Sequence, residues 1–542
     1  MARRPSFSTR WENPRSPLTW VVLLPLFAFL AWFYLPVTRG DFVADDYVFL
    51  ATARMVDTPL AAFWQSHFYE PYYFRPIGVL SWWVVTDLFG LDYTSHSLIN
   101  LFLHLGNVAL LLWLLRALAL SVTAVISGVA LFALGPFALA TILWPSNRFD
   151  LLACGFLLLQ AIAMIRALQG NVFAMPLAMV AALAACWSKE LAYPVATTMA
   201  FVGLAASGVP WQRRVMLFAL LGLAIGGAFF VRHVTVAGAY SSAGANPMAQ
   251  VIVGASTMIS SLPRLVELIV GTDRLPWFGW GLLGALFAAL IWERRDAADS
   301  NRLLGGATLI LLAAFTVQTP LAKNFAPMLD GSAFGTVTYA RFYYAPWLAV
   351  CLIAALIVSR GRLSGLATLT ITGITLASAA TARPLSESFA SWTRNEVKAI
   401  SVAATKAVEA GVADNQPCVF VFFGTENNQP FFRMFSDVTV KARTTLSDKV
   451  WRCHVMTEST PWLFAFPTTI TPVDLPLRPI PAADGLAKPD SVWSSIRYRY
   501  RLPTKDLAAL PGARFFDWRG NRFIEVTDEV RRGVRTVKSR DW

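Results

Sequence analysis

The chain has 542 residues, of which 56% are hydrophobic and only 15% are charged, and its mean hydropathy is +0.51. Soluble domains carry about 25% charged residues, so this composition excludes an ordinary soluble protein. Apolar runs recur along the chain, and each is long enough to cross the roughly 30 Å of hydrocarbon in a bilayer as a helix. We therefore expect a polytopic α-helical membrane protein.

The formal net charge of +13 would fit a nucleic-acid-binding protein, but the positions of the charges favour another explanation. Lys and Arg residues are concentrated in six short stretches that we place inside the cell: 1–17, 116–120, 166–171, 209–214, 293–302 and 359–362. Such an excess on the cytoplasmic side is the positive-inside bias of membrane proteins. The charge therefore records topology, and we expect no nucleic-acid partner.

Hydropathy and charge together predict eleven spans: 18–37, 95–115, 121–142, 151–165, 172–187, 191–208, 215–232, 276–292, 303–319, 343–358 and 363–382. The first apolar run is long and lacks a small-residue cleavage pattern, so we interpret it as an uncleaved span with the N-terminus inside. An odd number of spans puts the C-terminus outside. The long external loops, 38–94 and 233–275, contain apolar stretches at 75–91 and 251–270. We expect both stretches to be helices that lie along the outer membrane surface or are partly re-entrant, rather than spans.

The first external loop opens with an acidic cluster, Asp41, Asp45 and Asp46. Carboxylates placed where a helix leaves the bilayer are costly to bury, which favours a function for them. A general base at the membrane–water boundary is one such function. The alternative is an ordinary solvated loop, and the cluster alone does not separate the two.

Four polar residues of the second span, His96, Asn100, His104 and Asn107, are spaced so that they share one helical face. Polar side chains in hydrocarbon usually turn towards partners in the bundle interior. We expect interhelical hydrogen bonds for the last three. His96 is nearest the outer surface, and we predict that it contacts substrate.

Basic residues recur at the outer ends of three spans, namely Arg148, Lys189 and Arg341. Each alone is explained by snorkelling or by pairing, since Asp150 and Glu190 lie close in sequence. Cations and carboxylates at one membrane surface also suit a lipid-linked phosphate substrate, because the cations hold the phosphate and a carboxylate takes a proton.

From residue 383 on, hydrophobic runs shorten and charges rise. The pattern predicts a helix over 386–410 that stops at Gly411, a buried strand at 418–424, a half-exposed strand at 496–502 and a hairpin over 515–526 that turns at Gly520 and Asn521. We expect 383–542 to form a soluble mixed α/β domain in the periplasm. Cys418 and Cys453 are its only cysteines, and an oxidising compartment would allow them to pair, although the sequence leaves this open.

Several motifs of residues 18–382 occur together and in order: Asp45-Asp46, Phe74-Arg75-Pro76-Ile77, Leu88-Phe89-Gly90-Leu91, the His96–Asn107 face, Trp187-Ser188-Lys189-Glu190 and Ala340-Arg341-Phe342-Tyr343-Tyr344-Ala345-Pro346. This set resembles the GT-C superfamily of polytopic glycosyltransferases. It is most similar to the membrane half of the O-mannosyltransferase-like proteins that carry tetratricopeptide repeats, and to their bacterial relatives. After residue 383 we find no 34-residue period, so the acceptor of those relatives is not carried over.

The resemblance implies transfer from a polyprenyl-phosphate-linked sugar at the periplasmic face, with inversion at the anomeric carbon. It gives Asp45 the role of general base and Asp46 the second acidic position, which in relatives assists acceptor binding or, in some branches, a metal. The cations that fall on family positions near the donor phosphate are Arg75, Arg148, Lys189 and Arg341. We also predict substrate contacts for His96, Glu190 and Tyr343.

The same set is expected from the chemistry. An acceptor hydroxyl is a weak nucleophile, so a positioned carboxylate helps by removing its proton. The leaving polyprenyl phosphate needs cations that stabilise its developing charge rather than a general acid. The two-carboxylate arrangement of glycoside hydrolysis is therefore not required.

The leading hypothesis is an inner-membrane glycosyltransferase with a catalytic domain at 1–382 and a periplasmic domain at 383–542. Its acceptor would be an envelope glycan, such as lipopolysaccharide O-antigen, or a protein. No cofactor is firmly predicted, and a divalent cation at the acidic pair is left open because two carboxylates are too few to define a site. One alternative is a transporter or flippase of lipid-linked sugars. Another is a scaffold whose basic strand, with Arg497, Arg499 and Arg501, binds acidic partners.

Overall fold

The computed structural model describes residues 17–55, 58–64, 74–235, 247–270, 305–316, 332–360, 364–412, 418–424, 430–457, 463–465, 477–479, 496–500 and 512–535. By its internal contacts the chain divides into two compact units. Unit 1 comprises Met1–Thr38, Ser97–Phe230 and Asn246–Phe389. Unit 2 comprises Arg39–His96, Val231–Ala245 and Ala390–Trp542, so it joins the first external loop to the C-terminal region.

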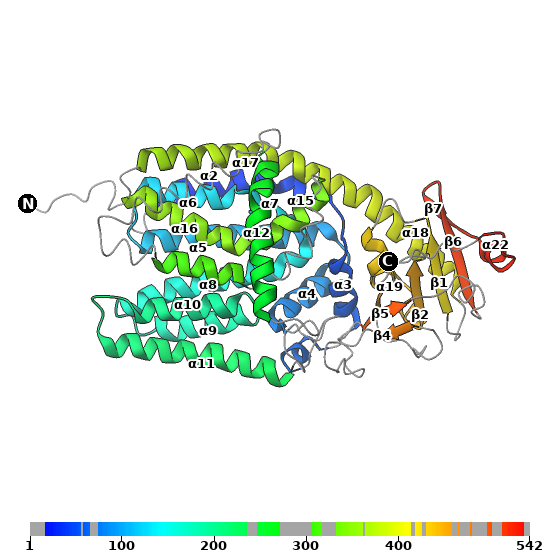
Figure 1. Ribbon diagram of the computed structural model, residues 1–542, viewed down its shortest axis with the longest axis horizontal. Coiled ribbons are helices and arrows are strands. Elements are labelled where there is room, and N and C mark those ends of the chain that lie inside the picture. Colours follow the sequence, from blue (N-terminus) through cyan, green and yellow to red (C-terminus); the bar gives the residue numbers. More distant parts are fainter. Residues whose placement is uncertain are drawn as a thin grey trace, which may run out of the picture. The chain divides into compact units, whose positions relative to one another are not determined.

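In its described residues, unit 1 consists of helices, most of which run side by side (Figure 1). Three of the helices, α5, α11 and α17, continue into unit 2. The helices are α2 (Pro17–Tyr34), α5 (Tyr93–Ala117), α6 (Val122–Ala133), α7 (Pro136–Leu143), α8 (Arg148–Leu168), α9 (Ala174–Cys186), α10 (Ala192–Leu204), α11 (Trp211–Thr235), α12 (Pro247–Val270), α15 (Ala333–Ala340), α16 (Tyr344–Arg360) and α17 (Ser364–Trp392), with a further helix over 305–316.

The ends of these helices follow from local sequence. Ser121 and Ser332 cap α6 and α15, because each serine hydroxyl accepts a hydrogen bond from a backbone N–H three residues on. Pro136 occupies the first position of α7, where its missing N–H would have no partner inside the helix. The short 3-10 helices η3 (Pro145–Asn147) and η5 (Arg341–Tyr343) join α7 to α8 and α15 to α16.

Helices occur at ten of the eleven predicted spans, and the remaining one, 276–292, lies outside the described residues. Five helical stretches of the described chain are long and apolar enough to cross a membrane, and α6 with α7, bent by 42°, makes a sixth if counted as one span. The helices α9 and α10 have 13 residues each. At 1.5 Å per residue that is about 20 Å, shorter than a bilayer core. The protein is thus a multi-pass helical membrane protein, while the count of eleven is not confirmed.

The stretch 251–270, predicted to lie along the membrane surface, belongs to α12. This helix runs across the direction of its neighbours in unit 1 (Figure 1) and contacts α7 and α15. Its crossing direction agrees with a surface helix, and its depth in the membrane stays a prediction.

Unit 2 begins with the first external loop, which contains α3 (Asp45–Met55), the 3-10 helix η2 (Pro59–Phe63) and α4 (Pro76–Phe89). Pro76 starts α4, and Gly90, with a φ of +56°, ends it, a backbone conformation that favours glycine. α3 packs against α4 and against α19 (Pro430–Arg443) of the C-terminal region. The stretch 75–91 is therefore a helix, as predicted.

The C-terminal region begins inside a continuous helical run, in which α17 passes through η6 (Thr393–Val397), a π-helical turn, into α18 (Lys398–Gly411). Gly411 is the last helical residue, as predicted, but the sequence did not predict the π-helical turn. No break occurs at 382–383, so the helix itself does not mark the predicted domain boundary, which stays a prediction.

The main sheet of unit 2 has the strand order β2-β1-β6-β7, formed by β1 (Cys418–Phe423), β2 (Cys453–Thr457), β6 (Ala513–Arg519) and β7 (Arg522–Glu525). β1 is parallel to both neighbours and all six of its residues are buried, as expected of a strand covered on both faces. β6 and β7 form the predicted hairpin, with positive φ at both Gly520 and Asn521 as a two-residue type I′ turn requires.

Shorter elements complete unit 2. A second sheet has the order β3-β5-β4, with β3 (Leu463–Ala465), β5 (Ile496–Tyr500) and β4 (Leu477–Pro479) in antiparallel pairs, and β5 is the predicted strand at 496–502. The helices α20 (Ser447–Val450) and α22 (Thr527–Arg531) flank β2 and β7 in sequence. Cys418 and Cys453, direct neighbours in the β1–β2 register with Cα atoms 4.6 Å apart, form a disulfide, which resolves the pairing that the sequence left open.

Candidate functional site

The acidic cluster lies at the start of α3 in unit 2. Ala44, directly before the helix, has a φ of +50°, which turns the chain sharply into α3. Asp46 is fully buried, and its carboxylate accepts a hydrogen bond from the Val43 N–H at 2.9 Å. Asp45 is partly exposed, so of the two predicted catalytic carboxylates it is the more accessible to a substrate.

The third carboxylate of the cluster, Asp41, is held by cations from the C-terminal region. Arg443 Nη2 donates to one oxygen at 2.6 Å, and Lys398 Nζ lies 3.2 Å from the other. The Asp41 N–H donates to Thr393 Oγ1 at 3.0 Å. The Asp41 side chain is only 4% exposed, and its two ion pairs explain how its charge is accommodated. No pattern in the sequence predicted these partners, which lie more than 350 residues away.

Tyr47, on the first turn of α3, shares the Arg443 guanidinium with Asp41. Arg443 donates to the Tyr47 hydroxyl from Nε at 3.1 Å and from Nη2 at 2.8 Å. Burial raises the pKa of the Tyr47 hydroxyl to about 12, so this group keeps its proton at neutral pH. Burial alone would lower the pKa of Arg443, but its contacts with Tyr47 and Asp41 raise it overall, so the guanidinium stays charged.

The other two predicted residues of unit 2 lie near the same loop. His96 is fully buried, its Nε2 lies 3.2 Å from the Gly90 carbonyl, and its ring packs against those of Phe42 and Trp82. Arg75 immediately precedes α4 and is 9% exposed. The predicted substrate contacts of His96 and Arg75 stay predictions.

In unit 1, the turn between α7 and α8 gathers the predicted cations. Arg148 is the first residue of α8 and is fully buried, and its Nε donates to Asn100 Oδ1 at 3.1 Å. Asn100 in turn donates to the carbonyls of Trp144 and Pro145. The Arg341 guanidinium lies 4.2 Å from the centre of the Trp144 ring, a cation–π arrangement.

Lys189 reaches the same turn through Asp150, with which it forms an ion pair and hydrogen bond. Asp150 lies two residues after Arg148 on the first turn of α8, and its side chain is 4% exposed. Of the four predicted donor-phosphate cations, Arg148 therefore lies within residues 144–150, and Arg341 and Lys189 contact this segment directly. Pairing, which the sequence offered as the alternative for Lys189, is present.

Glu190 and Tyr343 are the remaining predicted contacts. Glu190 is 5% exposed and follows Lys189 at the turn before α10. Tyr343 lies on η5, two residues after Arg341, and its hydroxyl donates to the Met258 carbonyl of α12 at 3.2 Å. Their substrate contacts stay predictions.

The polar face of α5 forms interhelical hydrogen bonds, as predicted for Asn100, His104 and Asn107. His104 Nδ1 lies 2.9 Å from the Tyr344 hydroxyl, and Asn107 donates to the same hydroxyl at 3.1 Å and to the Leu151 carbonyl at 2.9 Å. The network ties α5 to α8 and α16. It is a packing device of unit 1 and requires no substrate.

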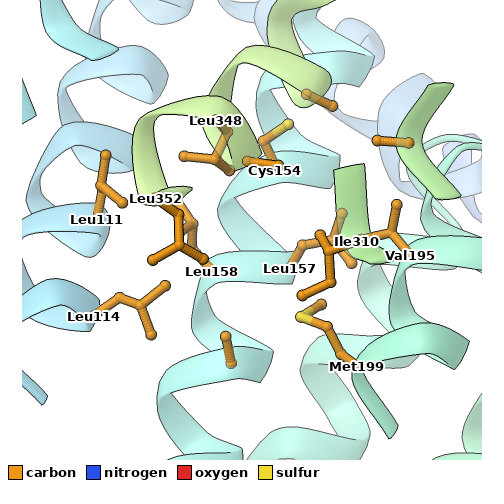
Figure 2. Close-up of a pocket in the computed structure, with 14 residues that line it drawn as sticks. Leu111, Leu114, Cys154, Leu157, Leu158, Val195, Met199, Ile310, Leu348 and Leu352 are labelled. Carbon is orange, nitrogen blue, oxygen red and sulfur yellow. The ribbon is translucent and has the colours of Figure 1, made fainter. Parts of the chain in front are cut away.

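An apolar cavity of about 70 Å³ lies among the helices of unit 1. Figure 2 shows its lining side chains, which come from α5, α8, α10, α16 and the helix over 305–316. Cys154 is the least apolar of them and lies four residues, about one turn, after Asp150 on α8. This lining is apolar and has no group that would bind a phosphate.

Within the described ranges, no group of three or more His, Cys, Asp or Glu side chains could hold a metal ion. A divalent cation at Asp45 and Asp46, which the sequence left open, is not tested by this observation.

No family model and no curated protein matches the chain. Solved structures to which it is similar include ArnT from Cupriavidus metallidurans in the apo state, with 13% identity, 89% of this chain and 98% of that chain covered, and a TM-score of 0.33. The same protein bound to undecaprenyl phosphate has 13% identity, the same coverage and a TM-score of 0.34. The Archaeoglobus fulgidus oligosaccharyltransferase in complex with Zn and sulfate has 12% identity, 80% and 62% coverage, and a TM-score of 0.38.

All three matches have TM-scores below 0.5 and identities of 12–13%. At such TM-scores and identities they carry no argument about the fold or substrate of this chain. The functional argument therefore rests on its residues.

Proposed function

We propose that this chain is an inner-membrane glycosyltransferase that moves a sugar from a polyprenyl-phosphate donor to an acceptor in the periplasm. The observation that carries the proposal is the set of cations around the first turn of α8. Arg148 lies on this turn, Arg341 stacks on Trp144 and Lys189 pairs with Asp150. An apolar cavity begins one turn further along the same helix. Cations beside an apolar cavity suit an anionic headgroup on a hydrocarbon chain.

In the proposed mechanism, Asp45 accepts the proton of an acceptor hydroxyl while that oxygen attacks the anomeric carbon of the sugar. The bond from this carbon to the phosphate oxygen breaks, and the bonding electrons leave with the polyprenyl phosphate. Attack from the face opposite the phosphate inverts the anomeric centre. The greater exposure of Asp45, compared with the buried and hydrogen-bonded Asp46, supports Asp45 as the base.

The cations have separate roles in this scheme. Arg148 and Arg341 present guanidinium groups that suit phosphate oxygens in two-point contacts. Lys189 presents an ammonium group, a compact positive charge that already contacts Asp150 at this turn, and we assign it to the same phosphate. We assign Arg75 to the same phosphate, and Glu190, His96 and Tyr343 to the sugar or acceptor. An envelope glycan is the acceptor class that we favour, with a protein as the second.

The test is transfer of radiolabelled sugar in membranes, from a panel of polyprenyl-phosphate sugars, into lipopolysaccharide and protein fractions. We expect Asp45→Asn to lower the rate by about 10²–10⁴-fold, the usual contribution of a general base. Asp92→Asn is the matched control, because Asp92 is an exposed aspartate just before α5 whose carboxylate accepts hydrogen bonds from the N–H and the hydroxyl of Ser95. Arg341→Gln should weaken donor binding.

Other outcomes would change the proposal in defined ways. Label that persists in Asp45→Asn but is lost in Asp46→Asn would move the base to Asp46. A rate that falls on chelation and returns with Mg²⁺ or Mn²⁺ would add a metal. No label from any donor, with folded and inserted protein, would overturn the enzymatic proposal and favour transport of lipid-linked sugars.

A further inference from the structure

The loop that carries the proposed base is fixed on both sides of Asp45 by a single guanidinium. Arg443 bonds the carboxylate of Asp41, four residues before Asp45, and the hydroxyl of Tyr47, two residues after it. All of these residues belong to unit 2. The intervening turn is short and contains the positive φ of Ala44, so a contact at each end restricts where the Asp45 side chain can lie.

Backbone contacts hold the same loop. The Asp41 N–H donates to Thr393 Oγ1, and a Cβ on Gly40 would come within 2.8–2.9 Å of the Tyr93 hydroxyl and Thr393 Oγ1. Only glycine allows the loop to approach so closely. The loop is therefore seated against the helical run that starts the C-terminal region.

The π-helical turn η6 places two contacts of Asp41 on one side of the helical run. Thr393, the first residue of η6, and Lys398, which directly follows it, both contact Asp41 and are five residues apart. In a regular α-helix such residues point about 140° apart. Bonding from i to i+5 brings residues at this spacing onto one face, and such turns are frequent at functional sites. The unusual turn thus lets both side chains reach one aspartate.

We propose that Arg443 and Lys398 are positioning residues, which hold Asp41 so that the proposed base Asp45 is presented for reaction. Turnover then depends on residues beyond 390, although we assign neither Lys398 nor Arg443 a contact with the reacting atoms. This inference rests on the proposed role of Asp45, and it gives Asp41 a role distinct from that of the other two acidic residues.

Arg443→Gln is the first variant, and Arg54→Gln is its matched control. Arg54 also joins α3 to the end of α19, because it donates to the carbonyls of Ala442 and Thr444, the residues on either side of Arg443. We expect Arg443→Gln to lower kcat by about 10–100-fold, since small misplacements of catalytic groups have such effects. Donor KM should stay within about twofold, because the cations assigned to the phosphate are untouched.

Two further readouts separate positioning from general destabilisation. The thermal midpoint of Arg443→Gln should fall no further than that of Arg54→Gln, and the pH at which kcat declines on the acid side should not move. Arg443→Lys should recover only part of kcat, because an ammonium group lacks the planar fork that serves both Asp41 and Tyr47. Equal kcat in Arg443→Gln and Arg54→Gln would overturn the inference. So would a loss of kcat that is explained in both variants by the fall in thermal midpoint.

A labelling experiment keeps this inference separate from the proposed function. Val43 is 1% exposed and lies in the loop 41–47, which Arg443 contacts at both ends and which we call the held loop. Val43→Cys should therefore react slowly with a membrane-impermeant thiol reagent. We expect labelling to accelerate at least about tenfold in Arg443→Gln but not in Arg54→Gln, as local opening becomes easier. Absence of sugar transfer in wild-type protein would sink the enzymatic proposal, whereas unchanged labelling alongside unchanged kcat would sink the positioning role.

Discussion

Asp41 and Asp150 are both 3% exposed, yet the chain neutralises them in different ways. Asp150 pairs with Lys189, which lies 39 residues along in the turn between α9 and α10 of unit 1. Asp41 pairs with both Lys398 and Arg443, which come from a remote part of the chain. A single substitution can therefore remove the cationic partner of Asp150, whereas Asp41 keeps one cation when the other is removed.

The largest effect that this comparison predicts is on stability when Lys189 is removed. Lys189→Met leaves the Asp150 carboxylate buried without its ammonium partner, and breaking a buried pair in this way typically costs about 3–5 kcal/mol. Arg443→Gln should cost less, because Lys398 still contacts Asp41. Thermal midpoints in one detergent, read by the onset of aggregation, would check the ranking.

The double variant Lys189→Met with Asp150→Asn is the control for that ranking. Removing both charges should restore much of the midpoint, because no unpaired buried charge then remains. A double variant as unstable as the single one would mean that packing of the lysine stem, rather than charge, dominates the effect.

The next effect concerns the support beneath the held loop. α19 rests on β2, because Asp437 accepts from the Val455 N–H and Ser436 donates to the Val455 carbonyl, and the disulfide ties β2 to β1. Cross-linking over a sequence separation of 35 is typically worth about 2–4 kcal/mol. We expect Cys418→Ala with Cys453→Ala to lower the thermal midpoint of wild-type protein accordingly, measured without reductant.

The same disulfide variant sharpens the comparison of the two carboxylates. Labelling of Val43→Cys should accelerate in it, since the end of α19 carries Arg443. The Asp150–Lys189 pair, which lies wholly in unit 1, should be unaffected. Labelling that stays slow would show that the loop is held by Arg443 independently of the β1–β2 link.

The features predicted from sequence are those with a local signal. The spacing of Asn100, His104 and Asn107 predicted a shared face, and their interhelical bonds confirm it. Gly520 and Asn521 predicted the hairpin, because they tolerate the positive φ that the turn needs. Pairing was one explanation offered for Lys189, but its partner Asp150, 39 residues away, was not singled out by the sequence.

The features that were missed depend on distant or irregular structure. Nothing in the order of residues connects Asp41 with Arg443, because an ion pair leaves no periodicity in either segment. The π-helical turn has no composition of its own, and the apolar pattern of 386–410 reads as one regular helix. The resemblance singled out Asp45 and Asp46, whereas no sequence pattern indicated the ion pairs of Asp41.

A smaller effect is expected for the second partner of Asp41. Lys398 is 51% exposed, whereas Arg443 is 11% exposed, so water and salt screen the lysine far more. Lys398→Met should cost less than about 1 kcal/mol, as exposed pairs usually do. The loss should shrink further when thermal midpoints are measured at high salt. If Lys398→Met lowered the thermal midpoint as much as Arg443→Gln at every salt concentration, Lys398 would not be the weaker partner of Asp41.

The smallest effect concerns the exposed ion pairs on the far edge of the main sheet. Burial alone would raise the pKa of Asp517, but hydrogen bonds from Arg535 and Arg519 lower it below its ordinary value. The pKa of Asp517 is therefore lower in the folded protein than in the unfolded chain, where it is about 3.9. The arginine contacts stabilise the fold fully above the unfolded pKa, and this stabilisation is lost as the pH falls through the folded pKa. The two arginine side chains are 31% and 48% exposed, so the gain should stay below about 1 kcal/mol.

Asp517→Asn tests this acid dependence, since it removes the charge and keeps an acceptor. The midpoint difference between wild-type protein and Asp517→Asn should be constant between about pH 7 and pH 5 and should narrow below about pH 4, where the wild-type carboxylate takes up its proton. The held loop supplies the contrast, because Asp41 faces the buried Arg443 rather than exposed arginines. A difference that widens on acidification would mean that Asp517 is stabilised in its protonated form, and that its arginine contacts do not govern its titration.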